Sequence, residues 1–460
     1  MIPMADNWFP QWRRVPANAL DGAHRVIAPD ERPPLGQLLL LGAQHTVAMF
    51  GSTVLAPLLM GFNPNLAILM SGIGTLLFFV IVGGRVPSYL GSSFGFIGVV
   101  IAVSGYAGHG PNGQIADALG GIVACGAVFA LTGLIVMVTG KRWIETLMPP
   151  VVTGAVVAVI GLNLAPVAIR SVSRSGFDSA IALMTIVCIG MVAVLARGAW
   201  SRLLILLGLL SAYLLYLIVT NGLGWGPPVD FATVATAPWF GLPTIHAPRF
   251  TSHGMLLICP VAIILIAENL GHVKAVGAMC GRNLDGYLGR AFIGDGVATM
   301  LSGAVGGTGV TTYAENIGVM AVTRIYSTLV FVAAAVFALV LGLSPKFGAL
   351  VQTLPAPVLG GTSIVVFGLI AVSGARIWIQ HHVDLNDTRH LLVAAVTLVL
   401  GAGDFTIHVG GFPLGGIGTA TFGAILLNAL LSLRRVPSAI RDAGPADAAG
   451  EVDRDRHRPH

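Results

Sequence analysis

The fold is decided by two stretches, GGRVPSYLGSSF at residues 83–94 and GGTGVTTYAENIG at residues 306–318. Each has a pair of glycines, a short polar extended stretch, a tyrosine, and then small polar residues that open a short apolar helix. Each is also the third apolar segment in its half of the chain. Because an odd number of spans per half inverts the second half relative to the first, this pattern is typical of transporters whose interrupted helices meet at a midplane site.

The composition around these stretches is that of a membrane protein. Of 460 residues, 55% are hydrophobic and only 10% are charged, whereas about a quarter are charged in soluble domains. The surplus apolar surface must therefore face a lipid bilayer. At roughly 20 apolar residues per span, the body between Leu35 and Leu433 has room for roughly twelve to fourteen spans.

Apolar runs broken by glycine, proline and charge predict two groups of seven segments on either side of a polar connection at 221–249. The first group covers 38–59, 66–82, 91–104, 116–138, 151–169, 180–195 and 203–219. The second group covers 255–270, 290–304, 315–322, 327–343, 358–372, 391–403 and 414–433.

The positive charges predict an orientation, with both termini in the cytoplasm. With an even number of spans, the following fall on the side of the termini: Arg85, Lys141, Arg142, Arg197, Arg202, Lys274, Arg282, Arg290, Arg324, Arg376, Arg389, Arg434 and Arg435. Four fall on the opposite side: Arg170, Arg174, Arg249 and Lys346. The tail at 1–35 lacks the apolar run of a secretory signal, and the tail at 434–460 is expected to be disordered.

Other classes of protein find no support in the sequence. The net charge of +5 does not indicate a nucleic-acid partner, because the basic residues sit singly in short loops. No P-loop, G-x-S-x-G or H-E-x-x-H motif supports ATP-driven transport or hydrolase chemistry. We expect no metal and no cofactor. The cysteines lack metal-like spacing and are interpreted as small buried hydrophobes: Cys125, Cys188, Cys259 and Cys280.

Ionisable residues inside apolar runs carry the functional information. Glu268 ends a long apolar run, and His272 follows four residues later on the same helical face. A carboxylate at that depth that gains and loses a proton would suit a proton-coupled carrier. The alternative is a Glu-His pair that only ties one helix to its neighbour.

A second carboxylate, Glu315, opens the short helix of the second stretch, where backbone N–H groups have no intrahelical partner. The alternative is a charge that only complements the helix dipole. On the facing broken element, Ser92 and Ser93 offer further backbone donors and Phe94 an aromatic ring. Two carboxylates, free donors and a ring fit a small planar solute that carries both N–H and C=O groups.

Three weaker candidates have structural interpretations. His45 either lines a site or hydrogen-bonds a neighbouring helix. Asp295 and Asp404 are interpreted as structural pairs or as residues near the membrane interface.

Several motifs together give a family resemblance. QHTVAMFG at 44–51, PSYLGSSF at 87–94, AENLGH at 267–272 and TYAENIGVM at 312–320 resemble signatures of the nucleobase:cation symporters of the nucleobase-ascorbate transporter family. The chain looks most like the uracil permeases within that family. Two further segments, LMPPVVTG at 147–154 and GAGDF at 401–405, are similar to the pyrimidine permease of the bacterial pyrimidine-utilisation (Rut) pathway.

The resemblance implies an all-α fold of fourteen transmembrane segments in two inverted repeats of seven. Segments 1–4 and 8–11 would form a core domain and the others a gate domain, with short antiparallel strands in segments 3 and 10. The implied divisions are an N-terminal tail at 1–35, core at 36–139, gate at 147–222, an extracytoplasmic connection at 223–250, core at 251–345, gate at 347–433 and a C-terminal tail at 434–460.

The resemblance also implies a substrate site. Glu268 and Glu315 would hold the nucleobase ring, and Phe94 and Ala314 would contact it through their backbones. His272 would hold Glu268 and take part in proton coupling. The neighbouring residues Ser93 and Tyr313 are included in the candidate site.

One departure from the uracil permeases concerns selectivity. Phe367 stands where those permeases can carry a tyrosine near the substrate, so the ring is kept and the hydroxyl is lost. Losing one hydrogen-bonding group can change discrimination considerably. Thymine, xanthine or another oxopurine is therefore an alternative substrate.

The resulting hypothesis is a symporter, not an enzyme, that imports uracil or a related pyrimidine with a proton as coupling ion. It would work by alternating access in the bacterial inner membrane, as a homodimer. An anion transporter of related fold is an alternative, although paired carboxylates would repel an anion. An integral-membrane enzyme or receptor would need a catalytic constellation or an extramembrane domain, and the sequence indicates neither.

Overall fold

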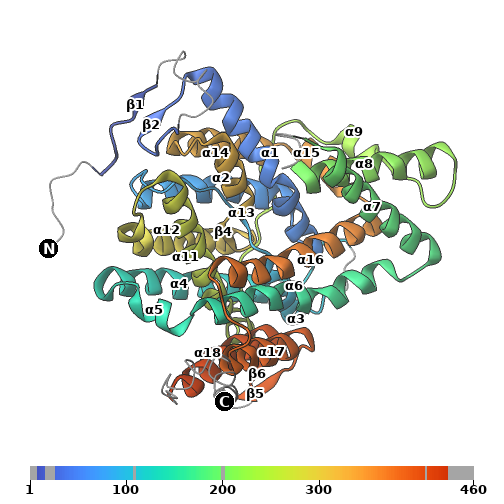
Figure 1. Cartoon of the computed structure of the whole chain (residues 1–460). Coiled ribbons are helices and arrows are strands. Elements are labelled where there is room, and N and C mark those ends of the chain that lie inside the picture. Colours follow the sequence, from blue (N-terminus) through green and yellow to red (C-terminus); the bar gives the residue numbers. More distant parts are fainter. Residues whose placement is uncertain (1–7, 16–25, 107–109, 198–202, 410–411, 434–460) are drawn as a thin grey trace, which may run out of the picture.

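The computed structural model describes residues 8–15, 26–106, 110–197, 203–409 and 412–433 as a predominantly helical bundle (Figure 1). The tail at 434–460, predicted to be disordered, lies outside the described residues. In the described part of the chain, nine helices are long and apolar enough to cross a membrane. They become ten when the pair α14 and α15, bent by 79°, is taken as one span.

The helices of membrane length follow the predicted order. They are α1 (Leu35–Met60), α2 (Pro64–Ile81), α4 (Ile115–Thr139), α6 (Pro150–Val172), α7 (Gly176–Leu195), α8 (Leu204–Leu217) with a π-helical turn (Ile218–Gly222), α10 (Ser252–Ile258) with α11 (Val261–Cys280), α16 (Ala356–Gln380) and α18 (Gly416–Leu433). Other helices are shorter or less apolar: α3 (Ile97–Ser104) after a 3-10 turn η2 (Phe94–Phe96), α5 (Arg142–Leu147), α9 (Ala232–Thr236), α12 (Leu288–Val305) after a 3-10 turn (Asp285–Tyr287), α13 (Ala314–Thr323), α14 (Thr328–Gly342), α15 (Pro345–Gln352) and α17 (Thr388–Ala402). Three two-stranded sheets complete the fold: β1 (Arg13–Arg14) with β2 (Glu31–Arg32), β3 (Leu90–Ser92) with β4 (Val310–Thr312), and β5 (Ile407–Val409) with β6 (Phe412–Leu414).

The predicted segment at 255–270 differs from the structure. The run at 255–270 is interrupted between α10 and α11 at Pro260, and α11 then continues to Cys280. Proline lacks the N–H that a continuous helix would use there, which explains the break. The helix extends beyond the predicted end to Cys280, where Gly281 with positive φ caps it, and the ammonium of Lys274 on this extension is paired with the carboxylate of Glu145.

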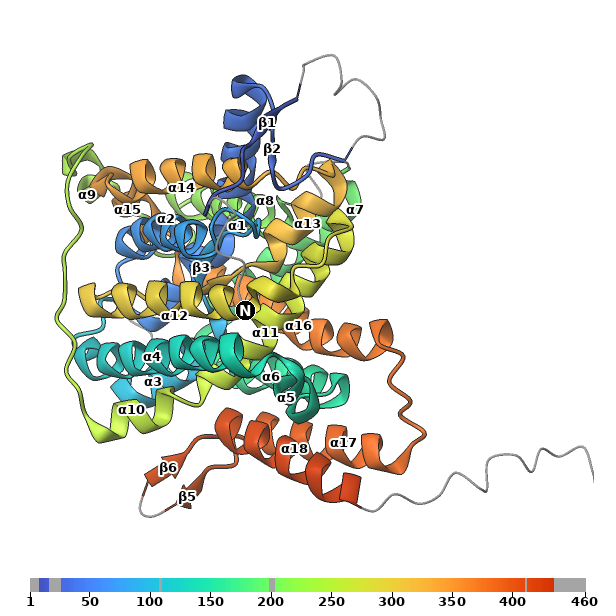
Figure 2. The ribbon, with the colours of Figure 1, turned by 90° about the vertical axis from the view of Figure 1, so that its left-hand side faces the viewer.

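The helices pack in two groups. In one group α4 lies against α12, while α14 lies against α1 and α2; in the other α6 lies against α16 and α17, while α7 lies against α8 and α16. Figure 2 shows α12 beside α4, with α17 and α18 at the far edge of the second group. Glycines allow the close approach: a Cβ on Gly133 would lie 2.6 Å from the Gly289 carbonyl oxygen, and one on Gly126 2.7 Å from that of Gly296. Small residues at crossings are the usual means by which membrane helices associate.

The strands β3 and β4 form a buried antiparallel ribbon that joins the two broken segments. Leu90 pairs with Thr312 and Ser92 with Val310, and the strands expected in these segments are therefore present. One threonine on each of the adjacent helices α2 and α12 forms hydrogen bonds with a strand backbone, and the two sets of bonds match. Thr75 of α2 bonds both the N–H and the C=O of Leu90, and Thr299 of α12 does the same for Val310.

The N-terminal segment is held against the first group of helices by aromatic residues. Trp8 Nε1 donates to the Val80 carbonyl at 2.8 Å, and Trp12 Nε1 donates to Thr328 Oγ1 at 2.9 Å. The turn after α2 accommodates this segment because its residues are glycines with positive φ. A Cβ on Gly83 would lie 2.5 Å from the Trp8 carbonyl oxygen.

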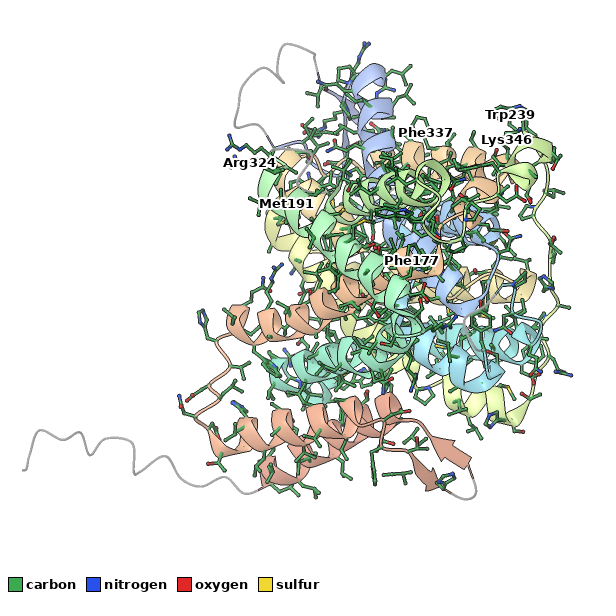
Figure 3. All side chains as sticks on the ribbon, turned by 90° about the vertical axis from the view of Figure 1, so that its right-hand side faces the viewer. Phe177, Met191, Trp239, Arg324, Phe337 and Lys346 are labelled. Atoms are coloured by element: carbon green, nitrogen blue, oxygen red, sulfur yellow. The ribbon has the colours of Figure 1, made fainter. Side chains whose placement is uncertain are left out.

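The long connection at 223–250 runs along one end of the molecule, from α9 to α10 (Figure 2). Lys346 Nζ of α15 lies 5.0 Å from the centroid of the Trp239 ring in this connection. Figure 3 shows both residues at one end of the bundle and Arg324, at the end of α13, on the opposite side. Arg249 pairs with Asp117 at 2.5 Å, so the connection is also fixed to the start of α4.

An ion-pair network fixes the short helix α5 between the two groups. Lys141 Nζ lies 2.5 Å from Asp285 Oδ2, and Lys274 Nζ lies 2.5 Å from Glu145 Oε1. The hydrogen bond from Lys274 lowers the pKa of the Glu145 carboxyl below its ordinary 4.5. The hydrogen bond to Asp285 raises the pKa of Lys141 above its ordinary 10.5. The network links the connection between α4 and α6 to α11.

We expect Gly91→Ala to destabilise the fold by about 1–3 kcal/mol, as overpacking of a tight site does. A Cβ at Gly91 would collide with the Tyr313 ring and would lie 2.6 Å from Thr53 Oγ1. The measurement is the Tm of the detergent-purified protein. Gly190→Ala is the matched control, because no atom lies within 4 Å of a Cβ there. Equal Tm values for the two variants would contradict the packing argument.

The contribution of Glu145 to stability should depend on pH. Its pKa is lowered in the folded state, so the contribution is present above pH 4.5 and is lost as the pH falls through the folded-state pKa. Because these side chains are 27–41% exposed, we expect a difference of at most about 1 kcal/mol between wild type and Glu145→Gln. Tm measured from about pH 7 down to about pH 3 should show the difference shrink towards the acid end. Gly190→Ala, which changes no titratable group and brings no Cβ within 4 Å of another atom, should show no such trend. A difference that grows with acid would refute the assignment.

Candidate functional site

The ribbon of β3 and β4 brings the starts of two short helices together. The 3-10 turn η2 begins at Phe94, one residue after the end of β3, and α13 begins at Ala314, one residue after the end of β4. The first N–H groups of such helices lack intrahelical partners and carry partial positive charge. The two capping residues have partners: the Ser93 N–H donates to the Gly309 carbonyl at 2.9 Å and the Tyr313 N–H to the Tyr89 carbonyl at 3.1 Å. The Ser93 side chain also accepts from the Gly95 N–H at 3.2 Å.

Glu315 lies in the first turn of α13 and is partly buried. Its Oε1 accepts a hydrogen bond of 2.7 Å from Ser52 Oγ on α1. Beside it is a cavity of about 210 Å³ between the two groups of helices, whose other lining residues are Ala48, Gly51, Leu204, Ile205, Leu206 and Leu369. A carboxylate therefore faces a small, mostly apolar cavity.

Glu268 of α11 supplies the second carboxylate. It is partly buried and lies close enough to Glu315 and Asp295 for their charges to interact. Within the described residues its carboxylate has no hydrogen bond to a protein group. His272, which the sequence predicts to hold Glu268, instead has Nδ1 2.8 Å from Thr312 Oγ1 of β4. The histidine therefore connects the helix of Glu268 to the ribbon.

Asp295 has a more central position than the sequence indicates. This fully buried side chain of α12 accepts from Asn269 Nδ2 at 2.6 Å and from Thr311 Oγ1 at 3.4 Å. Asn269 follows Glu268 directly, so the two helices are joined beside the site. Sequence reasoning missed Asn269, although its place in the AENLGH motif was a usable signal.

Two of the aromatic candidates have packing roles. The Tyr313 hydroxyl donates to the Ser92 carbonyl at 2.6 Å, and its ring lies over Gly91. Phe367 of α16 is only 1% exposed and belongs to the main core. Phe94 is partly buried against the same core, and Ala314 is exposed at the start of α13.

The weaker candidates are linked to their surroundings by hydrogen bonds. Asn316 Nδ2 lies 3.0 Å from His45 Nδ1 and 3.1 Å from its carbonyl oxygen, which joins α13 to α1. Asp404 Oδ1 accepts from the Gly416 N–H at 3.0 Å and from Asn163 Nδ2 at 3.2 Å. These contacts agree with the structural interpretation of both residues.

Comparison with known proteins identifies the class of protein to which this chain belongs. Residues 36–410 match the Permease family (Xan_ur_permease). The chain is 66% identical over 433 residues to the putative pyrimidine permease RutG of Escherichia coli (strain K12), covering 94% of this chain and 97% of that protein. It is 39% identical to the uracil permease of the same organism (92% and 98% covered) and 40% identical to that of Bacillus caldolyticus (88% and 94% covered).

Solved structures with a similar fold also come from transporters. The transmembrane domain of a cyanobacterium bicarbonate transporter, BicA, matches with a TM-score of 0.59 at 16% identity, covering 86% of this chain and 97% of that one. The murine anion transporter Slc26a9 matches with a TM-score of 0.61 at 12% identity, covering 87% and 68%. At these identities the likeness concerns the fold alone.

Together these findings define a multi-pass membrane permease rather than an enzyme. The chain belongs to the Permease family (Xan_ur_permease), and the family resemblance indicated by the motifs is confirmed.

Removing the amide of Asn269 should destabilise the protein, because Asp295 loses its 2.6 Å donor in a fully buried position. We expect Asn269→Leu to cost about 1–3 kcal/mol, measured as the shift in thermal unfolding. The exposed Asn386→Leu is the control and should change stability by no more than about 0.5 kcal/mol. Combining Asn269→Leu with Asp295→Leu removes both partners and should recover part of the loss; a further loss would show that the pair is not the cause.

Proposed function

We propose that this permease imports uracil or a related pyrimidine together with a proton across the bacterial inner membrane, by alternating access. The observation that carries the proposal is the pair of carboxylates, Glu268 and Glu315, on different helices beside the meeting point of two broken segments. A pyrimidine ring carries N–H groups that carboxylates accept and C=O groups that backbone N–H groups bind. The names of the relatives support this substrate class.

The positions of the two glutamates and the family resemblance support the proposed roles. Glu268 and Glu315 accept the ring N–H groups, while the backbones at Phe94 and Ala314 meet the remaining edge of the ring. Glu268 is proposed to carry the proton, since it lacks a protein hydrogen-bond partner in the described part of the chain. His272 would transmit its state to β4 through Thr312. The proton is the coupling ion, and no cofactor takes part.

Ser93, Tyr313 and Phe367 are proposed to stabilise the surroundings of the site. The hydrogen bonds of Ser93 and Tyr313 fix the ribbon that carries Phe94 and Ala314. Phe367 would supply an apolar surface without a hydroxyl, and xanthine or another oxopurine therefore remains the alternative substrate.

We further propose fourteen segments in two inverted repeats of seven. The matching bonds of Thr75 to Leu90 and of Thr299 to Val310 support the repeat, because each threonine serves the first residue of its strand. The two packing groups support a core at 36–139 and 251–345 and a gate at 147–222 and 347–433.

The proposed orientation places both termini in the cytoplasm, and the proposed assembly is a homodimer. The positive charges listed from the sequence support the orientation. The connection at 223–250 would then lie on the outer face.

Uptake of radiolabelled uracil into proteoliposomes, with and without an inward proton gradient, tests this function. We expect gradient-driven accumulation by wild type and by the exposed control Asp230→Asn. Glu315→Gln removes a charged acceptor and should reduce uptake at least about tenfold. Glu268→Gln should lose the response to the gradient.

The same assay ranks alternatives through competition with thymine and xanthine. Accumulation driven by the gradient in Glu268→Gln would remove the proton-carrier role from that residue. A folded wild-type protein that carries bicarbonate but not uracil would favour an anion transporter instead.

A further inference from the structure

Ser52 of α1 is a buried hydroxyl that bonds a carboxylate on another helix. Several buried threonines donate to the carbonyl four residues earlier in their own helix, as in Thr185 to Ile181, Thr362 to Val358, Thr397 to Val393 and Thr421 to Ile417, while Thr75 and Thr299 bond backbone groups of the strands. Ser52 is 2% exposed, yet its hydroxyl donates to Glu315 Oε1 at 2.7 Å. A short bond to a carboxylate is stronger than one to a neutral carbonyl.

The surroundings of Ser52 place this bond at the contact between the two groups of helices. At the preceding residue, a Cβ on Gly51 would lie 3.2 Å from Ile205 Cγ2 of α8. Both Gly51 and Ser52 line the cavity of about 210 Å³ that also contains Glu315 and Leu369 of α16. The Ser52 bond therefore fixes a carboxylate that faces a space large enough for a small solute.

The bond determines which part of the carboxylate a ligand meets. An ionised glutamate only accepts hydrogen bonds, through two oxygens that each have two lone-pair sites. With Ser52 occupying one site on Oε1, the orientation of the carboxylate is fixed and Oε2 stays available. A ligand that brings an N–H group finds a preorganised acceptor, while one without it leaves a buried charge unpaired.

We propose that Ser52 is a positioning residue that sets selectivity for ring N–H groups by orienting Glu315. This rests on the proposed function, because it assumes that Glu315 accepts from a nucleobase. Ser52 is not itself required to touch the substrate. Its removal should weaken binding and selectivity much more than the rate at saturation.

The test uses initial uptake rates in proteoliposomes over a range of uracil concentrations. We expect Ser52→Ala to raise KM about tenfold and to change kcat less than about twofold, as loss of a hydrogen bond that positions a charged group predicts. Ser52→Thr keeps the hydroxyl and should restore KM to within about threefold of wild type. Thr421→Val is the matched control, because it removes a buried hydroxyl whose partner is its own helix.

Competition by 1-methyluracil and 3-methyluracil, each lacking one ring N–H, gives the second readout. Wild type should discriminate against at least one of them, and Ser52→Ala should reduce that discrimination about tenfold. A merely structural role would not change the ratio. If Ser52→Ala does not fold, Ser52→Cys takes its place and should give an intermediate KM, since a thiol is a weak donor.

The outcomes separate the two proposals. Wild-type uptake of uracil with KM and selectivity in Ser52→Ala equal to those in Thr421→Val would overturn the role of Ser52 alone. An equal loss of kcat in Ser52→Ala and Ser52→Thr, with no change in selectivity, would also overturn it. Wild-type protein that neither binds nor takes up uracil would overturn the proposed function, and this inference with it.

Discussion

The fold depends on the backbone hydrogen bonds between β3 and β4. Chain that leaves the helical conformation inside a membrane must satisfy its N–H and C=O groups within the protein, since lipid offers no partner. Neither broken segment can do this alone. Each supplies the other with partners from Leu90 to Ser92 and from Val310 to Thr312, and Thr75 and Thr299 satisfy groups at the starts of the strands. The two halves of the chain are therefore joined where these two broken segments meet.

That constraint also creates the site. A helix that begins after a buried strand leaves N–H groups of its first turn without intrahelical partners, and both η2 and α13 begin in this way. Glu315 sits in the first turn of α13, where its charge is favourable beside those groups. Glu268 approaches from α11, which is joined to the ribbon by His272 and Thr312. The helix that carries Glu268 and the ribbon are thus physically linked.

The sequence contains enough to predict the broken segments and the two glutamates. Paired glycines and carboxylates are conspicuous in apolar runs, because each is costly there without a reason. The hydrogen-bond partners of these residues, in contrast, cannot be predicted from the sequence pattern. Ser52 and Glu315 are 263 residues apart, and a serine in a membrane helix ordinarily bonds to its own helix. Helix packing decides which hydroxyl bonds a distant carboxylate. The periodic pattern of the sequence does not contain that information.

Similar reasoning applies to His272, whose link to Glu268 stays a prediction. Four-residue spacing puts Glu268 and His272 on one helical face, which made their pairing the natural prediction. In the folded protein the His272 ring bonds Thr312, because β4 lies beside the face of α11 that carries this histidine. Residue spacing along one helix does not show which neighbour lies beside it. Asn269, which lies on another face, reaches Asp295 of α12. Local spacing limits the possible partners of a residue, and tertiary contacts select among them.

The same fold occurs in transporters named for bicarbonate and for anions, so the architecture does not set the substrate. Two helix starts that meet in a membrane form a positive site, which by itself suits an anion. In this chain two glutamates offset that charge, and one of them is held in place by Ser52. A neutral solute with both N–H and C=O groups can pair with carboxylates and with backbone donors at once, whereas an anion would be repelled by the first and a cation by the second. The charged and polar groups where the broken segments meet, more than the fold around them, thus limit which class of substrate the proposed site would bind.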